Sequence, residues 1–145
     1  MKSGAGFTLV ELLIVIVVSI AVVGITIPVG LNFYNNQIFE ETADNLLVVL
    51  RKAHGQAVFQ KNDSAFGVKF LSDSYVLFQG DSYASRAVDE DEIFNFSSNI
   101  NISGADEIVF SKLTGAPNTT ATLTITSNGN SQSININQYG KIELQ

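Results

Sequence analysis

The feature of this sequence that most limits its fold is an apolar run close to the N-terminus. Residues 7–31 are FTLVELLIVIVVSIAVVGITIPVGL, and Glu11 is the one charged residue among these 25. About 20 apolar residues are enough for a helix to cross a bilayer, whereas a secretory signal has a shorter core of about 7–15 residues. The run therefore predicts a signal-anchor helix, and Lys2 before it favours a cytoplasmic N-terminus.

Two features are unusual for a simple anchor. Glu11 is a carboxylate inside the apolar run, and an acidic residue at such a place is by default a functional-site hypothesis that needs a partner. The first six residues, MKSGAG, end in Gly6 directly before Phe7. Because glycine leaves the peptide bond flexible and unhindered, a protease could hold this bond extended.

The segment GFTLVELL, residues 6–13, resembles the processing motif of type IV prepilins and type II secretion pseudopilins. The resemblance implies that a membrane-embedded prepilin peptidase cleaves between Gly6 and Phe7 and that the same enzyme family methylates the new amine of Phe7. It implies that Glu11, the fifth residue of the mature chain, acts in subunit assembly. It also implies that other pilin or pseudopilin subunits and an inner-membrane assembly platform are partners.

The chemistry of the cleaved end agrees with this resemblance. Cleavage after Gly6 creates a positive amine on Phe7, four residues before the Glu11 carboxylate. An unpaired charge in a membrane or a packed bundle is costly, whereas a paired one is tolerable. The amine can come from the same helix or from a staggered neighbour, and we hypothesise that the second arrangement sets the register of assembly.

A kink is expected farther along this helix. Pro28 removes a backbone donor and clashes with the preceding turn, and Gly24 and Gly30 lie on either side of it. The family resemblance implies bending or local melting here on assembly. A tolerated proline with no function is an equally good interpretation.

The pattern becomes amphipathic from Ile38 onward. Apolar residues recur at spacings of 4, 3, 4, 3 and 4, which is one stripe of a helix: Phe39, Ala43, Leu46, Leu50, Ala53 and Ala57. We predict a helix over about residues 7–60, with a transmembrane first half and an amphipathic second half, ended by residues 61–64.

After Ser64 the apolar period changes to two, which is typical of strands. Strands are predicted at residues 66–70, 75–78, 93–96, 100–102, 108–111, 119–126, 133–137 and 141–144. The predicted class is α+β and pilin-like, with the long N-terminal helix packed on an antiparallel sheet. The predicted divisions are a leader (1–6), a transmembrane and assembly helix (7–31), its amphipathic continuation (32–60) and a β-rich head (64–145).

The head resembles the H-type minor pseudopilins of type II secretion. The segments that carry this second resemblance are LRKAHGQA at 50–57, FGVKF at 66–70 with Tyr75, and YGKI at 139–142. Major pilins often close a C-terminal loop with a cysteine pair, and this chain has no cysteine.

Composition excludes several classes of function. Fourteen acidic residues against eight basic ones give a net charge of −6 with no basic cluster, which argues against nucleic-acid binding through phosphates. The absence of cysteine removes disulfides, thiolate metal sites and cysteine nucleophiles. We find no nucleophile elbow and no phosphate-binding loop, and we expect neither an enzyme, nor a cofactor, nor a metal.

Two candidates for chemistry have simpler explanations. His54 is the single histidine, so it has no second histidine or cysteine with which to share a metal, and a packed or surface histidine is expected. The acidic run DEDE at 89–92 offers oxygens to a divalent cation, but it lacks the glycine-punctuated spacing of a calcium loop. A solvated loop is the favoured interpretation.

Together these features predict a structural subunit of a type IV pilus or a type II secretion pseudopilus, polymerised through its N-terminal helix. The expected location is the cytoplasmic membrane, single-pass with the head outside and in contact with lipid before assembly, and later an extracellular pilus or a periplasmic pseudopilus. The alternative is a membrane-anchored binding module with one span that does not polymerise. That alternative predicts an intact leader and no effect of changing Glu11.

Overall fold

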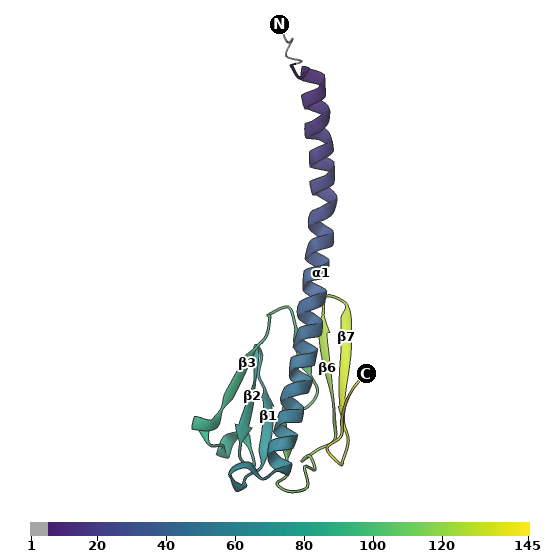
Figure 1. The fold of residues 1–145 in the computed structure, drawn as a ribbon. Coiled ribbons are helices and arrows are strands. Elements are labelled where there is room, and N and C mark those ends of the chain that lie inside the picture. Colours follow the sequence, from purple (N-terminus) through teal and green to yellow (C-terminus); the bar gives the residue numbers. More distant parts are fainter. Residues whose placement is uncertain (1–5) are drawn as a thin grey trace. The chain divides into compact units, whose positions relative to one another are not determined.

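One long helix precedes all the strands of this protein (Figure 1). The computed structural model describes residues 6–24 and 30–145; residues 25–29 belong to the helix, but their side chains, and the whole of residues 1–5, lie outside the described residues. Helix α1 spans Leu9–Val58. The chain divides into two compact units, residues 1–37 and 38–145, which we call the first unit and the second unit.

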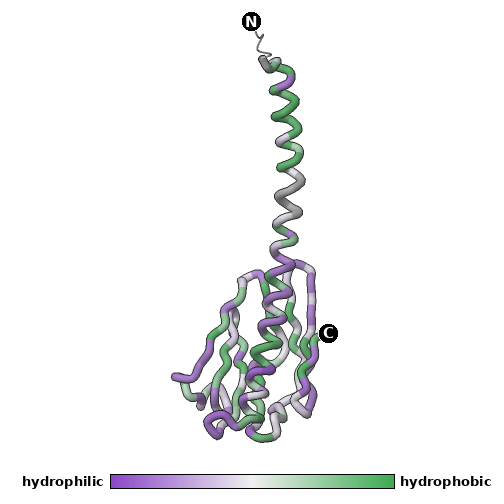
Figure 2. Tube along the Cα trace, viewed as in Figure 1, coloured by the Kyte–Doolittle hydropathy of each residue, from purple (hydrophilic) through white to green (hydrophobic). Residues whose placement is uncertain are grey.

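In the first unit, most of the described residues of α1 are coloured green in Figure 2, with purple and white ones among them. Its side chains are exposed in every direction: Leu12, Leu13, Ile14 and Val15 are 54–58% exposed, and four consecutive residues cover a full helical turn. No face of the helix is therefore buried along this stretch within the first unit. The kink predicted at Pro28 falls on a side chain outside the described residues.

The prediction of a single membrane span is wrong. Among residues 6–24 and 30–145, no helix is both long enough and apolar enough to cross a bilayer. The predicted transmembrane first half of the helix, and the predicted single-pass location in the cytoplasmic membrane, are corrected accordingly.

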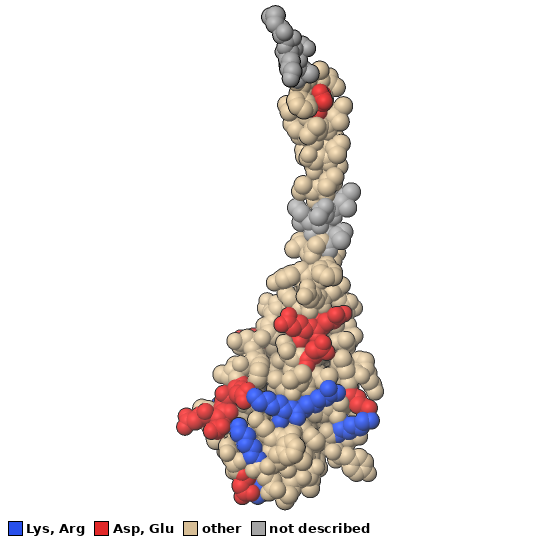
Figure 3. Space-filling model, in the orientation of Figure 1, with Lys and Arg blue, Asp and Glu red and all other residues tan. Residues whose placement is uncertain are grey.

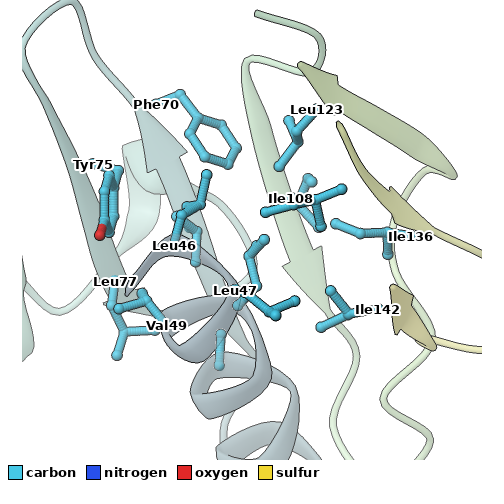
Figure 4. Close-up of a cluster of buried hydrophobic side chains, with 14 of the residues drawn as sticks. Leu46, Leu47, Val49, Phe70, Tyr75, Leu77, Ile108, Leu123, Ile136 and Ile142 are labelled. Atoms are coloured by element: carbon cyan, nitrogen blue, oxygen red, sulfur yellow. The ribbon is translucent and has the colours of Figure 1, made fainter. Parts of the chain in front are cut away.

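In the second unit, the predicted stripe of α1 is buried. Its six members are all at most 5% exposed: Phe39, Ala43, Leu46, Leu50, Ala53 and Ala57. Figure 4 shows helix side chains, Leu46 and Leu47 among them, between residues of two sheets. Tyr75 and Leu77 lie on one side, and Ile136 and Ile142 lie on the other.

The helix ends where the backbone becomes left-handed. Gln60, Asn62 and Asp63 have φ values of 53°, 52° and 56°. Asparagine and aspartate tolerate this region better than most residues. The Leu113 N–H donates to the Ala57 carbonyl at 3.1 Å, so a loop distant in sequence satisfies one of the last helical carbonyls.

Eight strands follow α1 within the described residues, and they form two antiparallel sheets. Their bounds are β1 Phe66–Phe70, β2 Ser74–Gln79, β3 Glu92–Asn95, β4 Asn101–Ser103, β5 Glu107–Phe110, β6 Ala121–Ser127, β7 Asn130–Ile136 and β8 Ile142–Leu144. The first sheet has the order β3-β2-β1-β5, and the second has the order β4-β6-β7-β8. The predicted α+β class, with an N-terminal helix packed on antiparallel strands, is confirmed.

The strands were expected to form one sheet, and the structure divides them between two. Strand β5 does not continue from β4 but pairs with β1, where Val68 lies opposite Ile108. Strand β4 pairs with β6, where Ile102 lies opposite Ile125. Alternation of apolar residues specifies which face of a strand is buried, but not which strand lies beside it.

We predict that Leu50→Ala destabilises the second unit by about 2–5 kcal/mol, the range for removing a fully buried leucine side chain. Leu50 is 0% exposed. The matched control is Val48→Ala on the same helix, because Val48 is 60% exposed and should change stability by only about 0.5 kcal/mol. Urea unfolding of both variants checks this, and equal midpoints would contradict the assigned core.

Candidate functional site

The predicted cleavage site lies in an exposed, non-helical segment directly before α1. Gly6, Phe7 and Thr8 precede the first helical residue, and Phe7 is 81% exposed. A Cβ added at Gly6 would meet no other atom within 4 Å. The Gly6–Phe7 bond is therefore accessible in this structure, and cleavage there and methylation of Phe7 stay predictions.

Thr8 caps the helix, a feature that our sequence analysis missed. The Glu11 N–H donates to Thr8 Oγ1 at 3.2 Å, so one of the four unpaired N–H groups of the first turn is satisfied. The signal was present in the sequence, since Thr8 and Glu11 have the T-x-x-E spacing of a capping box. The local chemistry of these two residues thus fixes where the helix starts.

The Glu11 carboxylate is exposed on the first turn of α1, and no hydrogen bond or ion pair to it is present among the described residues. The positive end of the helix dipole favours a negative charge at this position. Glu11 therefore has a stabilising role within its own helix. Its predicted pairing with the Phe7 amine of another molecule stays a prediction.

His54 is packed among residues from three parts of the chain. Its ring meets the Phe110 ring edge-on at a centroid distance of 5.4 Å. Gly115 (φ +64°) and Gly140 (φ +78°) both lie so close that an added Cβ would overlap the imidazole. No local pattern in the sequence indicates this contact, because the two glycines are more than 60 residues away from His54.

The environment of His54 does not form a metal site. No group of three or more histidine, cysteine, aspartate or glutamate side chains converges anywhere in residues 6–24 and 30–145. Burial lowers the pKa of His54 below its usual value of 6.5, because the charged imidazolium loses hydration. His54 is therefore a neutral packing residue at pH 7.

The acidic run at residues 89–92 is divided among separate cations. Asp91 accepts from Arg86 Nε at 2.7 Å, and Glu92 lies 2.6 Å from Lys52 Nζ. The Arg86 guanidinium also lies 3.7 Å from the centroid of the Tyr83 ring. Since these carboxylates point to different partners, the run anchors a loop to its surroundings and does not surround an ion.

Two concavities on the second unit are lined mainly by polar side chains. One of about 480 Å³ is bounded by hydroxyl and amide side chains such as Thr122 and Asn135, with Tyr139 beside them. A neighbouring one of about 460 Å³ contains Asp106, which pairs with Lys69, and Glu107, which accepts from the Tyr83 N–H at 3.2 Å. Neither lining brings a nucleophile next to a base.

Comparison with known proteins supports the fold. The minor pseudopilin EpsH from the Type 2 Secretion System of Vibrio cholerae has a similar structure, with a TM-score of 0.57 and 13% sequence identity. The match covers 73% of this chain and 94% of the EpsH chain. No protein-family model matches the sequence, and no curated protein matches it significantly. The fold is therefore pseudopilin-like.

We predict that His54 makes the second unit sensitive to mild acid. Its pKa is lower in the folded state than in the unfolded chain, so the unfolded chain binds the proton first as the pH falls below about 6.5. The free energy of unfolding should decrease from about pH 6.5 downward and show no contribution from His54 above that pH. Urea unfolding of the wild type and His54→Gln at pH 8 to 5 measures this; parallel pH profiles would show that His54 titrates normally.

Proposed function

We propose that this protein is a structural subunit of a filament of the type IV pilus or type II secretion pseudopilus kind, cleaved after Gly6, methylated on Phe7 and assembled through α1. The proposal rests on the exposed apolar surface of the first unit. Its large apolar side chains are exposed on all sides of one helix, and Glu11 is the charged residue among them. The fold likeness to EpsH supports the same role.

Exposing this apolar surface to water is energetically costly. A soluble monomer rarely exposes contiguous apolar patches larger than a few hundred Å². Because consecutive residues such as Leu12, Leu13 and Ile14 are all exposed by more than half, covering one face would not be enough. A bundle of identical helices covers every face at once, since each helix has neighbours around it.

Glu11 can define the axial register of neighbouring helices, which apolar packing does not define. Apolar contacts between helices are non-directional and tolerate sliding along the helix axis. A carboxylate enclosed in such a bundle needs a cation, and removing one partner of a buried pair costs about 3–5 kcal/mol. A Phe7 amine on a neighbouring subunit meets this need at one axial position, so it defines the register.

We expect the protein isolated from its native cells to lack residues 1–6 and to carry one methyl group on Phe7. Intact-mass and N-terminal sequence analysis checks both modifications. Gly6→Val should retain the leader, because the side chain hinders the extended bond that the peptidase holds. A wild-type chain that still begins with Met1 would instead favour the uncleaved, non-polymerising binding module.

We expect Glu11→Val to be cleaved normally but to be absent from filaments. The variant keeps the apolar surface and loses the carboxylate that pairs with the Phe7 amine. The readouts are the mass of the processed chain and the amount of sedimentable filament. Glu143→Gln is a matched control, because Glu143 lies on the edge strand β8 of the second unit, where it pairs with Lys141. A normal filament yield with Glu11→Val would contradict the assembly role.

A further inference from the structure

The outer face of α1 in the second unit has charges of opposite sign at its two ends. We define this face by the exposed residues Glu41, Asp44, Val48 and Arg51 together with Gly55. Figure 3 has the same orientation as Figure 1, in which α1 lies in front of the strands. It shows acidic side chains gathered above a band of basic ones on this face of the second unit. The face is therefore complementary to a shifted copy of itself.

The charges on this face make no ion pair among the residues that the structure describes. No hydrogen bond or ion pair involves the Asp44 carboxylate among the described residues. Arg51 donates one long hydrogen bond, from Nη2 to the Ile142 carbonyl at 3.4 Å. It forms no ion pair with any residue that the structure describes. Lys52 differs, because it is paired with Glu92 at 2.6 Å. Asp44 and Arg51 are thus charges of opposite sign on this face, neither of which has an ion-pair partner among the described residues.

Gly55 supports docking on this face independently of the charges. Glycine is the least favourable residue in a helix interior after proline. The fold does not require it here, since a Cβ added at Gly55 would meet nothing within 4 Å. A small residue on an exposed helix face permits close approach of another backbone or side chain, and Val48 on the same face is a protruding side chain that is 60% exposed.

A single shift of one helix along the axis of another accounts for both the charges and Gly55. Asp44 and Arg51 are separated by seven residues, and Val48 and Gly55 are separated by the same seven. Seven residues are almost two helical turns, so both pairs remain on one face, about 10.5 Å apart along the axis. A parallel copy shifted by this distance places its Arg51 opposite Asp44 and its Gly55 opposite Val48.

We propose that a second copy of this chain docks on the outer face of α1, parallel and displaced by two turns, with an Asp44–Arg51 ion pair and Val48 seated on Gly55. This inference rests on the proposed function, because it specifies which surfaces of neighbouring subunits meet outside the apolar first unit. An antiparallel copy centred on Val48 is a poorer fit, since it would place Asp44 opposite Lys52, which already has a partner.

Site-specific cross-linking tests the arrangement directly, because the natural chain contains no cysteine. Full-length chains carrying Asp44→Cys and Arg51→Cys are co-produced in the native host and treated with a short bismaleimide in intact cells. The expected result is a mixed 44–51 dimer that is several-fold more abundant than either like pair. Ser131→Cys combined with Arg51→Cys is the matched control, since Ser131 is exposed on a different element, strand β7.

Three outcomes would overturn the proposal, the first of them seen with a third variant, Val48→Cys, treated in the same way. A dominant like-with-like dimer of Val48→Cys would show the antiparallel arrangement. Wild-type levels of filament with no 44–51 product would show that subunits assemble through other surfaces, so that the proposed function survives and this inference does not. Absence of any association would contradict both.

Charge exchange provides a test without cysteine. Asp44→Arg and Arg51→Asp should each weaken subunit association about fivefold, the upper value for an exposed ion pair, and the double variant should restore it. Asp81→Lys is the control, because Asp81 is an exposed carboxylate away from α1. Failure of the double variant to recover association, with each single variant folded by circular dichroism, would contradict the Asp44–Arg51 pair.

Discussion

Burial of one stripe of α1 between two sheets is the interaction on which the second unit depends. Each sheet has an apolar face that must be covered, and no described strand belongs to both sheets. The helix covers both faces, and its small side chains Ala43, Ala53 and Ala57 are fully buried. Alanine at these places lets the strands approach the helix closely. The loop positions, the His54 contacts and the exposed face of α1 all follow from this packing.

In the first unit, by contrast, the apolar side chains of the same helix are exposed. There the large apolar side chains from Phe7 to Val23 are more than half exposed, and polar side chains bond within the helix itself, as Ser19 does to the Val15 carbonyl at 2.7 Å. Thr8 satisfies the Glu11 N–H, and the Glu11 carboxylate lies at the positive end of the dipole. A residue that stabilises its own helix in a monomer can serve a neighbour in an assembly, because the carboxylate remains exposed while its N–H is capped.

The candidate residues differ in how well the sequence indicated them. Gly6, Phe7 and Glu11 are recognisable because they form one short local motif. The environment of His54 was not recognisable, since Gly115 and Gly140 reach it only through the packing of two distant loops. The membrane span was an incorrect inference from an apolar run. The pairing of Asp91 and Glu92 with Arg86 and Lys52 also needed the structure, because these partners lie on different elements.

The sequence by itself determined the positions of the helix and the strands and the buried stripe from Phe39 to Ala57. These depend on periodicity and on nearby residues, which act over one or two turns of chain. The tertiary structure alone decided that the strands form two sheets, that β5 pairs with β1, and that Asp44, Val48 and Arg51 remain exposed while Gly55 is half-buried. The physical reason is that strand pairing and burial depend on which distant segments meet, and residue spacing carries no information about that choice.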